Sequence, residues 1–377
     1  MKSATSDGRR TQNPASWHDR AVIDTDRARV MLRDLVAALE RAADSRPAIA
    51  RRYCIAGAPV ALHVGANGAA RDMLDAIAPL ECPDDTSPPL LSLFIWDGQR
   101  DGVELPESPV LRRDDAPEAG LGGYAGDSLR AFYQPNAGVL SLLDTGRCRG
   151  HWWLRDVANT PYYERAAPFK HILQWWIADR GGALLHSAAV GIDGAGILIA
   201  GPSGSGKSST ALACVDAGFA FASDDYVLID ATHPPHAHLA YATAKVVRSS
   251  LDRHLHHRRH FRNLGRDDEK PMLFVHDVAP GRVGSPLALR AVVLPFVAHR
   301  ATTQLVRIHP AEMLRALAPS SVLLFPLAGD AAFRRMADAC RELPCFRAEL
   351  ADDPNDVAAA LRGLLVSSSS IGAMAAE

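Results

Sequence analysis

The chain has 377 residues, of which 47% are hydrophobic and 22% are charged, and its formal net charge is −2. This length predicts two domains, because single hydrophobic cores stop growing at roughly 250–300 residues. The near-neutral charge argues against nucleic acid or an acidic membrane surface as a partner. The six cysteines lack a CxxC pair, and the polar N-terminus lacks a long apolar run, so we expect a cytoplasmic protein without a disulfide framework or a cysteine zinc site.

The first half of the chain predicts a small α/β domain behind a polar start. Residues 1–16 are polar and are expected to be disordered. Residues 26–43 carry apolar side chains at helical spacing, and short strand-like runs then alternate with a helical run at 69–80. We therefore predict an N-terminal α/β domain over residues 17–165.

The second half begins with a long apolar-periodic helix predicted over residues 160–181. Trp175 and Trp176 on this helix are expected to be core residues, with a platform for stacking a base as the alternative. Beyond the helix, strands and helices alternate as in an α/β nucleotide-binding core. We predict a catalytic domain over residues 166–366 and a flexible tail over 367–377.

The segment GPSGSGKS satisfies the Walker A pattern G-x-x-x-x-G-K-[ST]. Its glycines let backbone N–H groups turn inward around phosphate oxygens, and the helix predicted from about Lys207 adds its positive N-terminal end. We expect Lys207 to hold the β- and γ-phosphates and the Ser208 hydroxyl to join the shell of a Mg²⁺ ion. The predicted nucleotide-binding residues are Gly201, Pro202, Ser203, Gly204, Ser205, Gly206, Lys207, Ser208 and Ser209.

Two adjacent acids, Asp224 and Asp225, follow the loop after a gap that holds one short helix and one strand. Both carboxylates are therefore expected at the phosphate end of the sheet. One acid in this position supports the magnesium, and the other accepts a proton from an incoming hydroxyl. A solvated turn is the alternative for such a pair.

Residues 184–229 resemble the catalytic domain of HPr kinase/phosphorylase, whose fold is related to the nucleotide-binding core of phosphoenolpyruvate carboxykinase. In that family a histidine precedes the loop, as His186 does here, and paired aspartates follow a single helix. The resemblance implies an α/β fold with a carboxykinase-like P-loop core, and ATP and Mg²⁺ as cofactors. It also implies that Asp225 is the base, that Asp224 assists the metal with Ser208, and that His186 supports the acid.

The chain departs from the family pattern at two places. Ser209 stands where the family has an acidic residue, and in KVVRSS the acid of a Glu-Val-Arg-Gly signature is replaced by Val246, although Arg248 fits its arginine. These changes leave open the second metal contact, the reverse phosphorylase reaction and HPr itself as the substrate. Lys245 and Arg248 are candidates to clamp the transferred phosphoryl group, with solvated basic side chains as the alternative.

Residues 249–270 are dense in histidine and arginine. They are candidates for a mobile lid, for a docking site for an acidic substrate, or for a solvated loop. Metal recruitment is a further alternative, against which the lack of a partnered cysteine counts. The histidines considered for it are His254, His256, His257 and His260.

These features predict an ATP-dependent kinase that transfers the γ-phosphoryl group in line to a hydroxyl, with a serine of a protein or peptide as the preferred acceptor. The alternatives are a kinase acting on a small-molecule alcohol and a non-catalytic nucleotide-dependent regulator. The lack of an NKxD-like motif favours ATP over GTP, and the short spacing to Asp224 argues against a motor protein. No nucleic-acid or membrane partner is expected, and a homo-oligomer would agree with the hexameric related enzymes.

Overall fold

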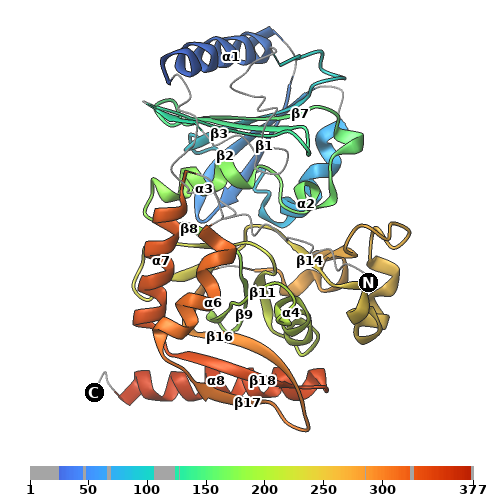
Figure 1. Ribbon diagram of the computed structural model, residues 1–377, viewed down its shortest axis with the longest axis vertical. Coiled ribbons are helices and arrows are strands. Elements are labelled where there is room, and N and C mark those ends of the chain that lie inside the picture. The colour runs from blue at the N-terminus through green and yellow to red at the C-terminus, as the bar shows by residue number, and fades with distance from the viewer. Residues whose placement is uncertain are drawn as a thin grey trace, which may run out of the picture.

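Two large β-sheets lie one above the other along the long axis of the molecule, with helices on their faces, and a third sheet has two strands (Figure 1). The predicted disordered start, residues 1–16, lies outside the residues that the structure describes. No helix in the described part combines the length and the apolar character that crossing a membrane requires. The structure is a computed structural model that describes residues 25–45, 48–65, 69–105, 124–126, 128–284, 286–322 and 327–374.

The upper sheet in Figure 1 has seven strands in the order β1-β2-β3-β7-β6-β5-β4. The β2–β3 and β3–β7 pairs are parallel, and the other pairs are antiparallel. The 3-10 helix η1 (Ala69–Leu80) lies in the crossover from β2 to β3. The strands are β1 (Ala48–Ile55), β2 (Ala58–Gly65), β3 (Leu91–Asp97), β4 (Tyr124–Gly126), β5 (Leu129–Gln134), β6 (Val139–Asp144) and β7 (Arg149–Leu154).

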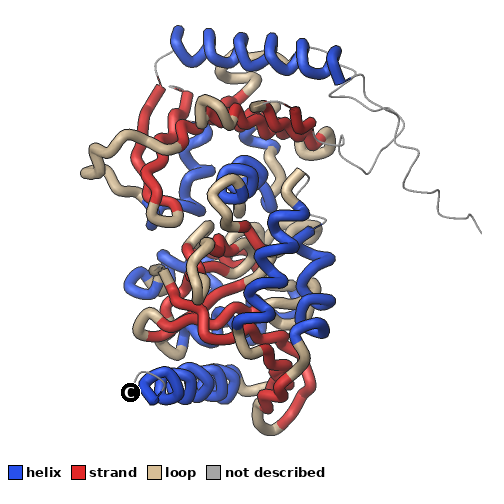
Figure 2. Tube along the Cα trace, turned by 90° about the vertical axis from the view of Figure 1, so that its left-hand side faces the viewer, coloured by secondary structure: helices blue, strands red, loops and turns tan. Residues whose placement is uncertain are grey.

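Helix α1 (Thr25–Ser45) covers the outer face of this sheet, as Figures 1 and 2 both show. Its buried leucines recur three and four residues apart, so one stripe of the helix faces the strands. They pack against Phe94 and Trp96 of β3 and against residues of β5 to β7. The buried residues of the stripe are Leu32, Leu35, Val36 and Leu39.

The single helix predicted over 160–181 is wrong, because the chain forms two helices there: α2 (Tyr162–Arg165) and α3 (Lys170–Ala178). Pro168 has no N–H to donate and disfavours a helical conformation in the residue before it. Phe169, which follows, adopts a φ of 44°. The helical spacing of the apolar residues did not reveal this break.

Helix α3 packs between the two sheets. Trp175 is 0% exposed and Trp176 is 4% exposed, so both are core residues as predicted. The same hydrophobic cluster includes Trp152 of the upper sheet and Leu184 of the lower sheet. The two sheets therefore share a continuous core around α3, while the division at 165/166 stays a prediction.

The lower sheet has nine strands on the path β11-β9-β10-β16-β13-β12-β8, with β18 pairing with both β16 and β17. Strand β16 is its centre, since it runs parallel to β10 and, further along, parallel to β18. This arrangement confirms the predicted α/β class. The strands are β8 (Ala183–Leu185), β9 (Ala188–Ile192), β10 (Ala195–Ile199), β11 (Ala220–Ser223), β12 (Val227–Ile229), β13 (His236–His238), β16 (Leu287–Arg300), β17 (Gln304–Arg307) and β18 (Cys345–Ala351).

Helices cover both faces of the lower sheet (Figure 2). On one face, α6 (Pro310–Val322) and α7 (Gly329–Glu342) pack through a shared hydrophobic cluster. On the other face, α4 (Lys207–Asp216) and α8 (Pro354–Met374) pack through another. Helix α8 therefore continues through most of the segment 367–377 for which a flexible tail was predicted.

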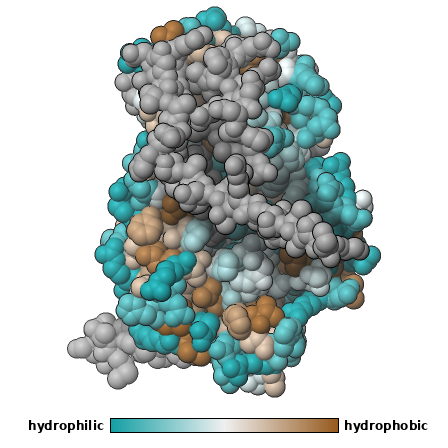
Figure 3. Space-filling view, in the orientation of Figure 1, coloured by the Kyte–Doolittle hydropathy of each residue, from teal (hydrophilic) through white to brown (hydrophobic). Residues whose placement is uncertain are grey.

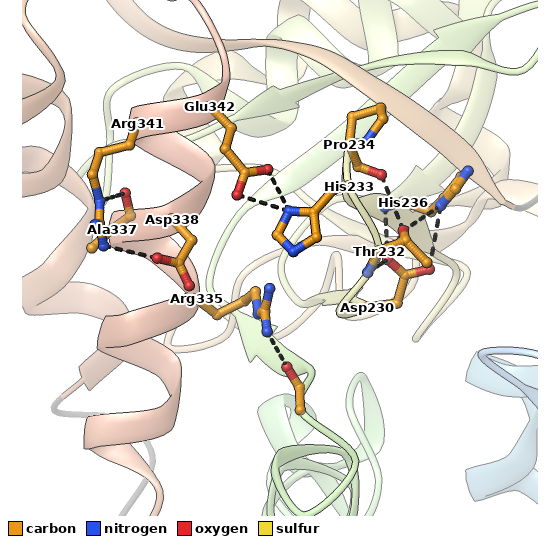
Figure 4. A network of polar contacts seen from close by, with 11 residues as sticks. Asp230, Thr232, His233, Pro234, His236, Arg335, Ala337, Asp338, Arg341 and Glu342 are labelled. Carbon is orange, nitrogen blue, oxygen red and sulfur yellow. Dashed lines mark hydrogen bonds and ion pairs between the residues drawn. The ribbon is translucent and has the colours of Figure 1, made fainter.

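Polar contacts hold α7 against the turns that flank the sheet (Figure 4). Arg335 donates a hydrogen bond to the carbonyl oxygen of Gly181 at 2.7 Å, and His233 lies 2.9 Å from Glu342. Six shorter elements complete the fold of the described residues. They are η2 (Val157–Asn159), β14 (Thr243–Lys245), η3 (Arg248–His260), β15 (Met272–Phe274), α5 (Val275–Val278) and η4 (Pro280–Arg282).

Candidate active site

The glycine loop connects strand β10 to helix α4, which begins at Lys207 as predicted. Gly206 has a φ of 104°, a conformation that favours glycine. At Gly201 an added Cβ would lie 2.7 Å from the Leu294 side chain, so only glycine fits there without movement. The chain thus turns from the sheet edge into a helix N-terminus, which is the arrangement that binds phosphate.

Two side chains of the loop, Lys207 and Ser205, carry hydrogen-bond donors that a bound anion could use. Lys207 is buried, and its ammonium donates to the carbonyl oxygens of Gly201 at 2.7 Å and Pro202 at 3.1 Å. Burial lowers the pKa of Lys207, while the carboxylates of the acid pair act in the opposite direction. The Ser205 hydroxyl is buried without a hydrogen-bond partner among the described residues. Both groups are suited to an anionic ligand in the loop.

Asp224 follows strand β11 and is almost completely buried. Its Oδ2 accepts a hydrogen bond from the Lys245 backbone N–H at 2.9 Å, whereas its Oδ1 is buried without a partner among the described residues. Burial, together with the neighbouring Asp225, raises the pKa of Asp224 to about 6, and the Ser208 hydroxyl acts against this rise. A buried carboxylate oxygen beside a serine hydroxyl suits a hard cation such as Mg²⁺.

Asp225 lies between two basic side chains. Its Oδ1 is 3.0 Å from His186 Nε2, and its Oδ2 forms an ion pair with the Lys245 ammonium. Burial opposes ionisation of Asp225, but Lys245 and His186 overcome it and hold the pKa of this carboxyl well below its usual range. Asp225 is therefore an ionised carboxylate fixed in position beside the glycine loop.

Strand pairing explains why His186 reaches the acid. Strand β8 pairs with β12 in a register that sets Leu185 opposite Val227, so the residues just beyond them come together at one end of the ladder. The His186 backbone N–H donates to the Ser321 hydroxyl of α6 at 3.1 Å. Its ring lies 5.5 Å from that of Tyr226. The β8–β12 ladder, Ser321 of α6 and the ring of Tyr226 thus fix the position of His186.

Arg248 contacts a loop instead of the acid pair. Its guanidinium donates to the carbonyl oxygens of Asn263 at 3.0 Å and Leu264 at 3.2 Å, and to that of Arg266. It also lies 3.7 Å from Asp267. Of the two basic residues considered as a phosphoryl clamp, Lys245 is the one that pairs with Asp225. The sequence suggested both Lys245 and Arg248 as partners of the phosphoryl group, and only the contacts in the folded chain show which of them reaches Asp225.

Ser209 lies next to the histidine-rich helix η3. Its hydroxyl is 3.5 Å from His254 Nε2, and the His254 side chain is buried. The two residues lie side by side at the start of α4. The segment 249–270 is therefore not entirely a solvated loop, because part of it packs as η3 against α4.

A cavity of about 820 Å³ opens beside the glycine loop. Its walls are mainly apolar and include Pro202 of the glycine loop and Pro295 and Phe296 of β16. Arg315 and Arg347 contribute positive charge. The space-filling view shows hydrophobic patches in the lower half of the molecule, which contains the nine-stranded sheet (Figure 3).

Comparison with known proteins identifies the segment around the site. Residues 181–251 match the family model of the HPr Serine kinase C-terminal domain. This segment is HPr kinase-like. It includes the glycine loop, His186, the acid pair, Lys245 and Arg248. The match confirms, over these residues, the resemblance that the sequence motifs indicated.

The other comparisons add less. The HPr(Ser) kinase/phosphatase from Coxiella burnetii is similar to this chain at 12% identity and a TM-score of 0.30, covering 49% of this chain and 98% of that one. No curated protein matches the chain. The kinase-like character of the chain therefore rests on the matched segment.

Proposed function

We propose that this protein is an ATP-dependent kinase that transfers the γ-phosphoryl group to a hydroxyl, with a serine of a protein or peptide as the acceptor. The observation that carries the proposal is the partly buried, ionised Asp225 held between His186 and Lys245 beside the glycine loop. A protein that only binds nucleotide does not need such a carboxylate. The HPr kinase-like segment supports the same class of reaction.

ATP would bind with its phosphates in the glycine loop. The Lys207 ammonium would exchange the carbonyl oxygens of Gly201 and Pro202 for phosphate oxygens, which offer it a stronger charge-assisted hydrogen bond. The base would pack in the adjoining apolar cavity, against Phe296. A cavity of mainly apolar walls with a few polar groups is the usual environment of such a ligand.

Ser208 and Asp224 would hold Mg²⁺. The unpartnered Asp224 Oδ1 and the nearby Ser208 hydroxyl provide the oxygen ligands that this ion prefers. A bound Mg²⁺ neutralises charge on the β- and γ-phosphates during transfer. Because burial raises the pKa of Asp224 to about 6, protons compete with the ion for this carboxylate at acidic pH, and binding should strengthen as the pH rises.

The chain's own residues would carry the transfer. The acceptor oxygen forms a bond to the γ-phosphorus while the bond to the oxygen bridging the β- and γ-phosphates breaks, and the acceptor proton passes to Asp225. His186 holds the Asp225 carboxylate in one orientation, and the Lys245 ammonium stabilises the negative charge of that carboxylate. Since positioning dominates this chemistry, a low pKa does not disqualify Asp225.

The proposal is tested by incubating the purified protein with γ-labelled ATP and Mg²⁺, alone and with a lysate or candidate serine peptides. The kinase account predicts that label moves to an acceptor and that transfer is lost in Lys207→Ala and Asp225→Asn. Phosphoamino-acid analysis then distinguishes serine from other acceptors, and label in a small molecule would instead identify a small-molecule kinase. Tight ATP binding without any labelled acceptor would contradict the kinase proposal and favour a nucleotide-dependent regulator.

A further inference from the structure

The structure brings two histidines and one aspartate together at the far end of helix α4. Asp216 is the last residue of α4, and His256 and His257 belong to η3. His256 Nε2 lies 2.9 Å from Asp216 Oδ2, and His257 Nε2 lies 2.7 Å from Asp216 Oδ1. The three ligand atoms all lie within 4.8 Å of one another.

From this cluster we propose a site for a divalent transition-metal ion of the zinc class, bound by Asp216, His256 and His257. Imidazole and carboxylate are ligands of Zn²⁺, and three protein ligands leave a fourth position for water. Two imidazoles make the set unsuitable for Mg²⁺ or Ca²⁺, which prefer oxygen. The site is distinct from Ser208 and Asp224 and does not depend on the proposed kinase reaction.

The geometry needs only a small adjustment. Tetrahedral ligands at Zn²⁺ bond lengths of about 2.0–2.1 Å lie roughly 3.3 Å apart, so each imidazole must retreat from the carboxylate by about half an ångström. The Asp216 side chain is 33% exposed and that of His256 is 55% exposed, which leaves an open side for an ion and water. His257, at 11% exposure, is the fixed ligand.

A second aspartate–histidine cluster, around Asp230, shows a carboxylate whose acceptor positions are used by protein donors (Figure 4). Asp230 Oδ1 accepts from the Thr232 and His236 backbone N–H groups and from the Thr232 hydroxyl, while Oδ2 faces both His236 and His238. The lone pairs of this carboxylate are used by protein donors. At Asp216 each oxygen instead faces one imidazole.

An ion in this site would join two parts of the nucleotide-binding region. Helix α4 carries Lys207 at its start and Asp216 at its end, and η3 also reaches Ser209 through His254. Metal binding would therefore fix η3 along the whole length of α4. The expected role is structural, since the ion would lie at the end of α4 opposite the glycine loop.

The experiment uses the full chain freed of metal, with Co²⁺ as the probe and excess Mg²⁺ present to occupy an oxygen-ligand site. We expect one Co²⁺ per chain with the visible absorption of four-coordinate cobalt, and Zn²⁺ to displace it and to raise the melting temperature. His257→Gln keeps an amide donor for Asp216 but should weaken Co²⁺ binding by more than about tenfold.

The matched control is His238→Ala, because His238 is 12% exposed and also contacts an aspartate. This variant should bind Co²⁺ as the parent does, and circular dichroism checks that each variant is folded. Co²⁺ binding that is absent in the parent, or equal in the parent and in folded His257→Gln, would overturn the site and leave two ordinary histidine–aspartate hydrogen bonds.

Discussion

His186 Nε2 lies 3.0 Å from Asp225 Oδ1, although the two residues are 39 positions apart in the chain. The other carboxylate oxygen pairs with Lys245, which comes from a third segment. The ladder between β8 and β12 and the short strand β14 bring these segments together. The acid is therefore held in its ionised form by contacts that only the folded chain supplies.

The ion pair with Lys245 should stabilise the folded protein. Lys245→Met leaves the partly buried Asp225 with only His186 beside it, and because the pair is partly exposed we expect a cost of up to about 3 kcal/mol, below that of a fully buried pair. The folded pKa of Asp225 is depressed in the parent, so its stabilisation is present above the unfolded pKa and is lost as pH falls. Without Lys245 the pKa rises, and urea unfolding should show the largest loss near pH 7 and a smaller one near pH 4.

The surface pair of Arg51 and Glu81 is the control for that measurement, because both side chains are about one third exposed. Arg51→Met should change the unfolding free energy by less than about 1 kcal/mol at either pH. A loss in Lys245→Met that is the same at both pH values would contradict the electrostatic explanation.

Asp224 should destabilise the metal-free protein at neutral pH. Burial raises the pKa of Asp224 from 3.8 to about 6, so the folded state binds the proton more tightly than the unfolded state does. Stability therefore falls as pH rises from about 4 to 6 and stays lower above that range. Asp224→Asn removes the charge and should raise the unfolding free energy at pH 8 by up to about 3 kcal/mol.

The Asp224→Asn measurement is made in EDTA without nucleotide, and the gain should disappear near pH 4. Addition of Mg²⁺ and ATP should reverse the order, because only the parent retains the proposed metal ligand. A variant that is less stable than the parent at pH 8 in EDTA would contradict the cost assigned to the buried carboxylate.

The sequence motifs predicted residues that the fold brings together in the candidate site, and the fold adds contacts that no motif indicates. The glycine loop and the adjacent acids are visible as local patterns, and the family resemblance pointed to His186. Lys245 and Arg248 lie close together in the chain, and no local pattern tells which of them meets the acid. That choice follows from the pairing of β14 with β15 and from the 263–267 loop that Arg248 contacts.

The break between α2 and α3 had a different cause. The apolar periodicity of residues 160–181 is helical on both sides of Pro168, so the proline was the only local sign of a turn. The crowding of side chains between the two sheets could not be read from periodicity. The histidine-rich segment likewise gave four alternatives, because its packing on α4 depends on contacts with Asp216.

Trp175 should be essential to the shared core. It is completely buried between the sheets, and truncating a buried tryptophan costs about 3–5 kcal/mol. Trp175→Ala is therefore expected to lower the unfolding free energy by this amount in urea denaturation. Val30→Ala, on the exposed side of α1 at 57% exposure, should change it by less than about 0.5 kcal/mol. Equal effects of the two substitutions would contradict the assignment of α3 to the core.

The base-binding role of the cavity is tested at Phe296, which is 56% exposed. Phe296→Ala should weaken ATP binding by roughly tenfold, since a lost aromatic contact is worth about 0.5–1.5 kcal/mol beyond its buried area. Melting temperature should be unchanged, and binding of inorganic triphosphate should match the parent in calorimetry. If the substitution weakens the binding of ATP and of triphosphate equally, Phe296 acts on the phosphate-binding loop and not on the base.

The most direct test compares ATP binding with phosphoryl transfer in Asp225→Asn. The substitution keeps the shape of the side chain, so calorimetry should give a dissociation constant for Mg²⁺–ATP within about threefold of the parent, while transfer of γ-label to the acceptor should fall by about 10²–10⁴-fold. Parent-like transfer by a folded Asp225→Asn would contradict the assignment of Asp225 as the base and, with it, the central claim.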